Sequence, residues 1–368
     1  MQRFLLLSLS LAIAFPGFVA AQSSPRPTAT PAPTTIPSTA DAPAPDSVDA
    51  LDPADVQKAI SLIEEKYVKP AAVTGPEVNR ATLQGFLDRL DRGAMLMAPR
   101  GAPTPTPPPF YREIIGGHIG YLRPGDLNES QLQELDTTLR GFSGKRVDAI
   151  VLDLRGSVPA TDFAAAAEFA NRFILKDKPL FQLRSPSGTP VDFVSRSVPA
   201  YSGIVIGLID QETIGATEVL AAVLHENKAI LIGERTAGRT IQYADLPLPS
   251  GKILRLAVAE ATLMQAEPRL DKGVAPDLAV ALPLATKDEM FQQSLTQGMA
   301  PFVFENDRPH LNEAALLAGT NPEIEAAAAA QQRRLRGERP PPHDPVLQRA
   351  VDVITSIGVY EKQPGRPP

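Results

Sequence analysis

Two hydroxyl side chains lie where a short polar turn leads into a predicted helix, and a nucleophile could act there. Thr213 and Thr217 flank Gly215, after the apolar strand 203–209 and at the start of a helix. A strand, turn and helix in this order bring the free N–H groups and the positive end of the helix dipole to the turn. Such a turn suits a nucleophile and an oxyanion site. A threonine on the first helical turn more often caps the helix, and Glu218 more often complements its dipole than acts as a base.

Other side chains offer little further chemistry. His225 falls late on the same helix, where a partner for the C-terminal dipole is the expected role. His118, His310 and His343 lie in unrelated segments, so no metal-ligand spacing is present. The chain has no cysteine, which excludes disulfides, thiolate metal sites and a cysteine nucleophile. We therefore predict no metal site and no cofactor.

Apolar segments that alternate with helical patterns must position this turn. Ala149–Leu154 is short and rich in β-branched residues, as in a buried parallel strand, and the alternation of strands and helices predicts an α/β core. The other predicted elements are a helix begun by a capping box of Asn128 and Gln131, a helix at 162–173, and strands at 180–184, 229–233, 252–258 and 274–278.

Five short motifs occur in the order found in the carboxyl-terminal processing (tail-specific) serine proteases, which this chain resembles over about residues 117–282. The resemblance implies an α/β fold with a tail-specific protease (ClpP/crotonase-like) core of strands alternating with helices. The motifs are Gly117–Leu122 (family I-G-Y-I), Asp153–Gly156 (D-L-R-x-N-P-G-G), Thr213–Glu218 (S-A-S-A-S-E), Glu234–Arg239 (G-E-x-T-x-G-K-G) and Lys272–Asp277 (K-G-I-x-P-D).

The same resemblance implies that the catalytic residues of the family are replaced. The nucleophilic serine falls on Gly215, which has no side chain, and the lysine base falls on Arg239, whose guanidinium stays protonated. The glutamine that orients the lysine falls on Tyr243, with Gln242 one place early. Arg239 could instead bind a peptide carboxylate through its two-pronged guanidinium, or pair with Glu234.

The oxyanion site is altered as well. The resemblance places its backbone donors at Pro159, Ala160 and Ala216. Pro159 has no N–H to donate, and the loss of one such donor typically slows catalysis by about 10²–10³. The resemblance therefore implies a retained scaffold from which the chemistry has been removed, with Thr213 and Thr217 as alternative nucleophiles.

Composition and charge limit which cellular compartment and which classes of partner are expected. Residues 1–21 carry Arg3, an apolar run and Val19-Ala20-Ala21, as in a cleaved secretory signal. We therefore predict export, most simply to a bacterial periplasm, without stable membrane insertion after cleavage. The formal net charge of −6 and the lack of a long basic run make nucleic acid an unlikely partner.

Proline content and helical periodicity divide the remaining chain. No PDZ domain, the peptide-capturing module usual in the resembled family, fits in the proline-rich stretch 98–110. A last helix begins at Asp344-Pro345 with Leu347, Val351 and Ile354 inward, to dock on the N-terminal helices or on a partner. The predicted segments are a signal peptide (1–21), a Pro/Ala/Thr-rich linker (22–50), an N-terminal helical region (51–97), a Pro-rich linker (98–116), the protease-like core (117–285) and a C-terminal helical region with a Pro-rich hinge (286–368).

Together these patterns favour an exported serine peptidase-like protein that has lost its catalytic dyad and binds a peptide or protein partner. The partner and the oligomeric state are unspecified. One alternative is a divergent active serine-type peptidase that acts on the C-termini of periplasmic proteins through Thr213 or Thr217. A second is a structural adaptor that uses its terminal helices while the old cleft is idle.

Overall fold

A computed structural model describes most of the chain, which divides into two compact units, residues 1–77 and 78–368. The signal peptide, the 22–50 linker and most of the alanine run and hinge in 304–341 lie outside the described residues. The described residues are 51–98, 106–145, 147–186, 188–264, 270–303 and 342–361, with 324, 328, 331 and 332.

The first unit contains helix α1 (Pro53–Lys66) and the short helix η2 (Pro70–Ala72). Asp52 caps α1 as predicted, since its side chain accepts the Asp55 N–H at 2.8 Å and Pro53 fills the first helical position. Its predicted apolar stripe remains largely exposed. Helix α2 (Gly75–Leu90) spans the boundary between the units and also buries no residue.

A six-stranded sheet forms the centre of the second unit, in the order β11-β8-β7-β4-β3-β2. All neighbouring pairs are parallel except β2 with β3. Strands β3 and β4 are buried along their whole length, which explains their continuous apolar sequence. The strands are β2 (Tyr111–Ile115), β3 (Ile119–Arg123), β4 (Ala149–Asp153), β7 (Ile204–Ile209), β8 (Ile230–Gly233) and β11 (Leu278–Ala279).

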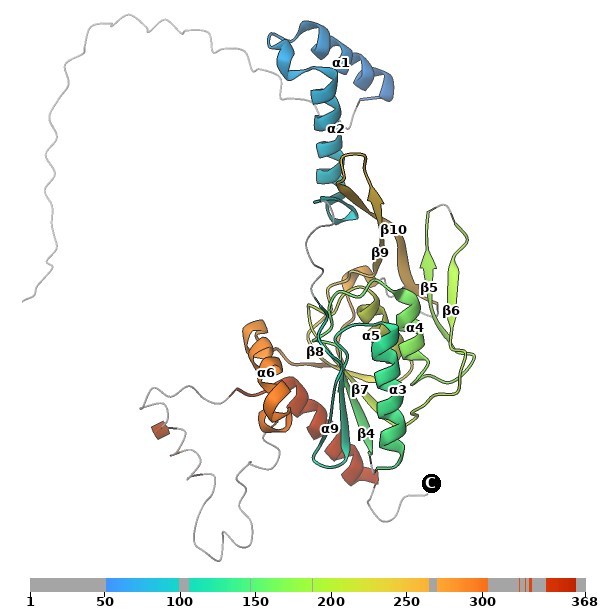
Figure 1. Ribbon diagram of the computed structural model, residues 1–368, viewed down its shortest axis with the longest axis vertical. Coiled ribbons are helices and arrows are strands. Elements are labelled where there is room, and N and C mark those ends of the chain that lie inside the picture. The colour runs from blue at the N-terminus through green and yellow to red at the C-terminus, as the bar shows by residue number, and fades with distance from the viewer. Residues whose placement is uncertain are drawn as a thin grey trace, which may run out of the picture. The chain divides into compact units, whose positions relative to one another are not determined.

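Helices cover both faces of this sheet, as Figure 1 shows. On one face, α3, α4 and α5 pack over a large apolar cluster. On the other, α6 and α9 close a second cluster. The result is a three-layered α/β core, which confirms the predicted fold class. The helices are α3 (Glu129–Ser143), α4 (Phe163–Ala170), α5 (Ala216–Glu226), α6 (Leu284–Gln297) and α9 (Pro345–Glu361).

The last helix is part of this core, which corrects the expectation that it docks on the N-terminal helices or a partner. Leu347, Val351 and Ile354 are buried as predicted. They belong to one cluster with Val151 and Ile206 of the central sheet. Because both faces of a parallel sheet must be covered, α9 supplies apolar surface that the core needs.

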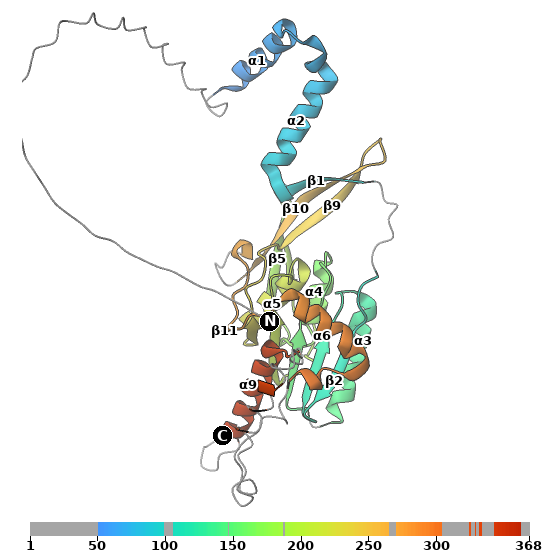
Figure 2. The same cartoon turned by 90° about the vertical axis from the view of Figure 1, so that its left-hand side faces the viewer.

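A second, antiparallel sheet is built around the long strand β10 (Ile253–Leu263), visible in Figure 2. Two strands fall where the sequence predicted other structure. The last residues of the expected helical region 51–97 form strand β1, because they pair with β10. Part of the expected linker 98–116 forms strand β2, because it pairs with β3. The other members are β1 (Ala94–Met97), β5 (Pro179–Arg184), β6 (Val191–Val194) and β9 (Ile241–Pro247).

Local details differ from the predictions in two further ways. Asn128 caps α3 by accepting the Gln131 N–H at 3.0 Å, but Gln131 does not complete the capping box. Its side chain instead accepts from Gly125 and donates to the Pro108 carbonyl, which ties the 106–110 segment to the core. Helix α4 is shorter than the predicted 162–173, and β10 is longer than the predicted 252–258. Short 3-10 turns occur at η3 (Asp91–Gly93), η4 (Leu270–Lys272) and η5 (Ala300–Phe302).

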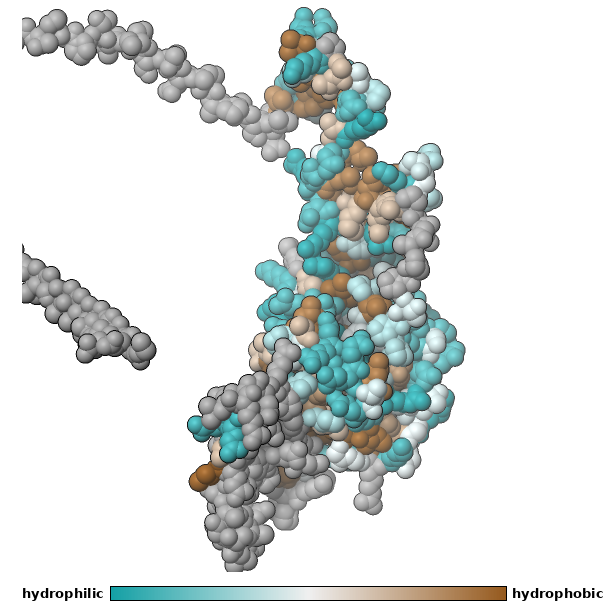
Figure 3. Space-filling view, turned by 60° about the vertical axis from the view of Figure 1, so that its left-hand side comes forward, coloured by the Kyte–Doolittle hydropathy of each residue, from teal (hydrophilic) through white to brown (hydrophobic). Residues whose placement is uncertain are grey.

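Apolar side chains reach the surface on α2 and on the sheet around β10. Figure 3 shows apolar surface on this part of the second unit. The exposed residues include Leu83, Phe86, Leu90, Leu96 and Leu246. Within the described ranges, no helix has the length and apolar character needed to cross a membrane.

Candidate functional site

Gly215 lies at the sharp turn between β7 and α5, where the resemblance places a nucleophile. It is the N-cap of α5, with φ +66° and ψ −136°. Residues that carry a Cβ rarely adopt this backbone conformation, whereas glycine adopts it without strain. A nucleophile held on a strained turn between a strand and a helix is a recurrent arrangement in hydrolases. In this chain the turn is kept and the side chain is absent.

Three separate segments meet at this glycine. The Gly215 N–H donates to the Arg239 carbonyl at 2.9 Å, and the Ala216 N–H donates to the Ala160 carbonyl at 2.9 Å. Ala160 and Gly215 form an isolated parallel β-bridge. A Cβ added at position 215 would overlap the Ala160 carbonyl oxygen. The fold therefore brings Ala160, Gly215, Ala216 and Arg239 together, and a side chain at 215 would require the Ala160 carbonyl to shift.

Two of the three backbone positions that the resemblance implies for an oxyanion site, Pro159 and Ala216, supply no free donor. The Ala216 N–H, which points from the start of α5, is already bonded to Ala160. Pro159 has no N–H. An oxyanion site needs donors aimed at the position of the developing charge, and neither of these two positions supplies one.

Glu218 holds the loop that carries Arg239. Its fully buried carboxylate accepts hydrogen bonds from the Thr236 hydroxyl, from the Gly238 N–H at 2.7 Å and from the Arg239 N–H at 2.8 Å. Burial raises the pKa of Glu218, while these hydrogen bonds and the charge of Arg239 oppose the rise. Glu218 is thus neither a free base nor only a partner for the helix dipole, because its main contacts fix the loop 236–239.

The Arg239 side chain is exposed to solvent. The ion pairs formed among the described residues do not include one between Arg239 and Glu234, so the structure does not support that alternative. Gln242 and Tyr243 follow on β9, opposite Ala259 and Ala257 of β10. Being consecutive on a strand, they point to opposite faces of the sheet.

The two alternative nucleophiles are buried rather than presented to a groove. The Thr213 hydroxyl accepts the Asp210 N–H at 3.1 Å, so it stabilises the turn before α5. Thr217 is 1% exposed, and its hydroxyl has no hydrogen-bond partner, so it does not cap the helix as expected. The Thr213 hydroxyl also lies 3.4 Å from the Asp210 carboxylate, a long contact within the turn, whereas the Thr217 hydroxyl has no partner among the described residues.

A buried lysine that the sequence analysis did not single out, Lys287, contacts Asp210, the same residue that bonds to Thr213. Lys287 on α6 donates to Asp210 at 2.6 Å, to Glu212 at 2.7 Å and to the Arg155 carbonyl at 3.1 Å. Burial alone would lower the pKa of Lys287, but the two carboxylates outweigh it and raise the pKa above its ordinary value. A general base must be able to become neutral, so Lys287 acts as a structural cation here.

The turn that leads to Pro159 is anchored by a buried ionic network. Arg155 donates to Asp153 at 2.7 Å and to Asp344 at 2.8 Å, and Tyr121 donates to Asp153 at 2.6 Å. Burial would raise the pKa of Asp153, but the charge and hydrogen bonds of Arg155 hold it below its ordinary value. The Asp153-Leu-Arg motif is thus joined to the start of α9, where Asp344 also caps the helix.

The remaining motif and His225 have structural contacts, whereas His310 lies outside the described residues. Asp277, at the end of the Lys272–Asp277 motif, accepts the Leu231 N–H at 2.7 Å and lies 3.1 Å from His225 Nε2. His225 is in the last turn of α5, as predicted. The part of the chain that is described contains no group of three or more acidic or histidine side chains able to hold a metal ion.

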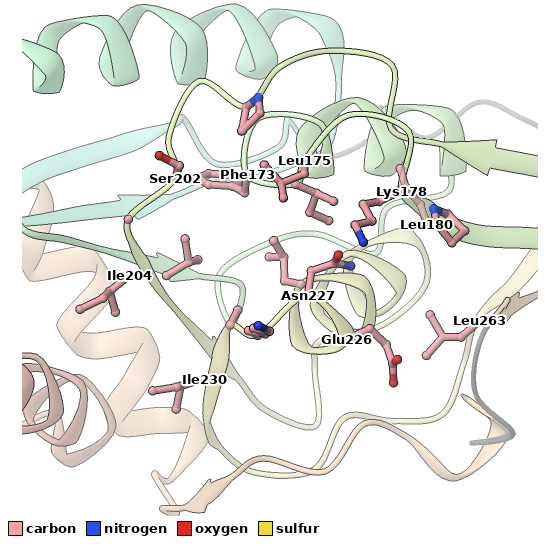
Figure 4. A pocket seen from close by; sticks show the side chains of 18 of the residues that line it. Phe173, Leu175, Lys178, Leu180, Ser202, Ile204, Glu226, Asn227, Ile230 and Leu263 are labelled. Carbon is pink, nitrogen blue, oxygen red and sulfur yellow. The ribbon is translucent and has the colours of Figure 1, made fainter. Parts of the chain in front are cut away.

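Among the described residues, one cleft lies near the turn before Pro159 and another lies farther away. One of about 570 Å³ adjoins the turn Gly156–Val158 and helix α6. The other, of about 610 Å³, lies at the C-terminal end of α5, where Figure 4 shows Lys178 and Asn227 within a largely apolar ring. An 11-residue helix is about 16 Å long, so this larger cleft is remote from Gly215.

Comparison with known proteins agrees with this geometry. Residues 118–280 match the family model described as Peptidase family S41. The carboxy-terminal processing protease CtpA of Bacillus subtilis is 29% identical over 175 residues, which cover 47% of this chain and 37% of that protein. The carboxyl-terminal-processing protease of Synechocystis is 27% identical over 176 residues, covering 48% and 41%. The chain therefore spans less than half the length of these curated relatives.

Among solved structures, the photosystem II D1 C-terminal processing protease is similar to this chain. It is 21% identical, with a TM-score of 0.41, over 51% of this chain and 48% of that one. The match to the S41 family model covers 118–280, the part of the chain that holds most of the central sheet. Carboxyl-terminal processing proteases are homologues of this part of the chain.

Proposed function

We propose that this protein is a catalytically inactive relative of the carboxyl-terminal processing proteases, which binds a peptide or a protein partner on the surface around Arg239 and the Gly215 turn. The proposal is supported by the retained strand, turn and helix and by the loss of every group that would perform hydrolysis there. The protein would then recognise a polypeptide without cleaving it.

One observation carries the proposal: the position of the nucleophile is closed. A side chain at 215 would overlap the Ala160 carbonyl, and the Ala216 N–H already donates to that same oxygen. Replacing glycine by serine at position 215 would therefore not be enough for activity, because the Ala160 carbonyl oxygen lies where the new Cβ would be. Restoring a serine would require the Ala160 segment to move.

The catalytic test compares the wild-type chain with stepwise restorations. The wild-type protein should neither hydrolyse labelled peptides nor react with a fluorophosphonate probe. The double variant Gly215→Ser, Arg239→Lys should also be inactive, because the new Cβ overlaps the Ala160 carbonyl oxygen and neither Pro159 nor Ala216 supplies a free donor. Adding Pro159→Gly supplies an N–H, worth about 3–4 kcal/mol in catalysis, but more than trace activity also requires the Ala160 segment to move away from position 215.

The active-peptidase alternative makes the opposite prediction. If the wild-type chain turns over peptide and Thr213→Val or Thr217→Val abolishes that turnover, the protein is an enzyme and the proposal is wrong. A matched control is Thr137→Val, which changes an exposed threonine on α3 whose hydroxyl donates only within its own helix. Loss of activity in the control as well would indicate a folding defect instead.

Binding is tested separately. Fluorescence anisotropy should detect binding of a labelled peptide that ends in small apolar residues, and Arg239→Ala should weaken it. Arg140→Ala, which removes an exposed arginine on α3, is the control and should bind as wild type. Equal affinity for both variants would exclude a role for Arg239 in binding.

The adaptor function remains the second candidate because α1 presents an unpaired apolar stripe. Ile60, Ile63 and Tyr67 are 37%, 51% and 46% exposed, although they lie on one helical face. An adaptor that uses this stripe should lose its partner after Ile63→Asp but keep it after Arg239→Ala. The converse pattern supports binding at the surface around Arg239.

Export to a periplasm is part of the proposal and rests on residues 1–21 of the sequence. Their charged, apolar and small-residue order is typical of a cleaved signal. Intact-mass analysis of the periplasmic fraction should find a chain that begins near Gln22. Recovery of the full-length chain in the membrane fraction would overturn this part of the proposal.

We also propose that no PDZ domain delivers the ligand. Only residues 98–110 separate β1 from β2, and about a hundred residues are typical of a domain. The peptide must then be recognised by residues of the region 118–280 itself.

A further inference from the structure

The larger cleft, at the C-terminal end of α5, has the size and the lining of a small-molecule site. Its volume is about 610 Å³, and ligand pockets typically measure about 300–1,000 Å³. Most of its wall is apolar, with polar side chains at a few positions, as Figure 4 shows. This cleft is hereafter called the Lys178 cleft. Its apolar wall includes Phe173, Leu180, Ile204, Leu224, Ile230 and Leu263.

The Lys178 cleft and the Gly215 turn lie at opposite ends of the central sheet. Ile204 and Ile230, which line the cleft, are the first residues of the parallel strands β7 and β8. Gly215 instead follows the last residue of β7 after a short turn. The cleft is therefore separate from the position where the family resemblance implies catalysis. All of its lining residues belong to the second compact unit.

Two lysines place positive charge at the mouth of this cleft. Lys178 and Lys228 are both exposed, and neither takes part in the ion pairs found among the described residues. Glu226 also lines the cleft, but in Figure 4 its carboxylate points away from Lys178. Two lysines and one glutamate give the lining a net charge of +1, in a chain whose formal net charge is −6.

The backbone beside both lysines has an uncommon conformation. Among the described residues other than glycine, positive φ angles occur at Asp91, Asp177 and Lys228. Lys228, with φ +73°, follows the C-cap of α5, a position that glycine usually occupies. Asp177, with φ +63°, directly precedes Lys178. Such conformations are uncommon for residues with a Cβ and cluster at functional sites, which supports a role for the two lysines.

The nearby C-terminus of α5 opposes an anion only weakly. The negative end of a helix dipole arises from carbonyl groups without a donor. Here the Asn227 N–H donates to the Leu224 carbonyl at 3.1 Å, and the Lys228 N–H donates to the His225 carbonyl at 3.0 Å. The Lys228 side chain adds a positive charge at the same helix end. An anion at the mouth of the cleft is therefore compatible with this helix terminus.

We propose that the Lys178 cleft binds a small amphipathic carboxylate, a molecule with one apolar chain and one anionic head group, such as a medium-chain fatty acid. The chain lies against the apolar wall around Leu180, Leu224 and Ile230, and the carboxylate meets Lys178 and Lys228 at the mouth. An inorganic anion would make no use of the apolar wall, and a neutral apolar molecule would make no use of the lysines. The site is independent of peptide binding around Arg239.

The test titrates the full chain with decanoate by isothermal calorimetry, at low salt and below the concentration at which micelles form. Decanol has the same chain without the charge and should bind about three- to tenfold more weakly, since two exposed ion pairs are lost. Butyrate has the same head group on a shorter chain and should show no measurable binding. Each buried methylene that it lacks changes the affinity by about fourfold.

Exposed variants test the cleft without disturbing the core. Lys178→Gln should weaken binding of decanoate but not of decanol, and adding Lys228→Gln should make the two affinities equal. The matched control is Lys176→Gln, an exposed lysine two residues away and outside the lining. Leu175→Asp, at a lining residue that is 61% exposed, should weaken both ligands. Its control is Val198→Asp, outside the lining and 79% exposed.

Several results would overturn this proposal. Equal affinity of the wild-type chain for decanoate and decanol would exclude recognition of the carboxylate. Equal effects of Lys178→Gln and Lys176→Gln would show only general attraction of an anion. Binding to phosphatidylglycerol vesicles that depends on Lys178 and Lys228, without binding of free decanoate, would show that the lysines contact a membrane surface instead. None of these results bears on peptide binding around Arg239.

Discussion

Substitution of Gly215 by alanine tests most directly whether the nucleophile position is closed. Gly215 has a positive φ, and an added Cβ would overlap the Ala160 carbonyl oxygen. Gly117, in the turn between β2 and β3, also has a positive φ of +77°, but a Cβ there would meet no atom within 4 Å. Comparing Gly215→Ala with Gly117→Ala therefore separates the cost of backbone strain from the cost of the steric overlap with Ala160.

The magnitude follows from these contacts. At Gly117 the strain of about 1 kcal/mol is partly offset by the reduced entropy of the unfolded chain, which is worth ~0.4–1 kcal/mol. At Gly215 the overlap adds about 1–3 kcal/mol of overpacking. Displacing Ala160 also leaves the Ala216 N–H unpaired, at about 1–3 kcal/mol. Gly215→Ala should therefore cost about 2–6 kcal/mol more than Gly117→Ala.

Urea unfolding at neutral pH measures this difference, with the slope of the transition checked for two-state behaviour. A thermal scan should show Gly215→Ala melting roughly 10 °C below Gly117→Ala. If the two variants unfold at the same urea concentration, the Ala160 carbonyl moves aside at little cost. The closed-site argument would then be wrong, and Gly215→Ser would become a plausible route to activity.

Three further predictions follow from the buried network and the turn. Asp344→Asn should destabilise the protein by about 3–5 kcal/mol, because it leaves the buried charge of Arg155 only partly paired, and urea unfolding checks this. Arg155 lowers the pKa of Asp153 in the folded protein, so the ionised Asp153 contributes its full stabilisation above the ordinary carboxyl pKa. This stabilisation is lost as the pH falls through the pKa of the folded protein, so the urea midpoint of unfolding should decrease from pH 6 to pH 3. Thr213→Val should cost about 1–2 kcal/mol in the same assay, because the Asp210 N–H loses its acceptor, without changing peptide affinity.

The sequence determined the strand, turn and helix around Gly215 because their signals are local. A β-branched apolar run, a polar turn and a helical apolar face define β7 and α5 without help from the rest of the chain. The nature of the substitutions was equally readable, since glycine lacks a side chain and proline lacks an N–H wherever they occur. The caps at Asp52, Asn128 and Asp344 follow from the same local chemistry.

Tertiary structure alone decided which groups meet. Strand β1 forms only because β10, more than 150 residues later, offers it an edge, and propensity alone does not reveal such pairing. The link of Arg155 to Asp344 and the burial of Arg123 between two rings join segments separated by up to 189 residues. The resemblance of Thr213–Glu218 to the family motif placed the nucleophilic serine at position 215. Only packing showed that the Ala160 carbonyl occupies its place, since contacts between distant segments have no periodic signal in the sequence.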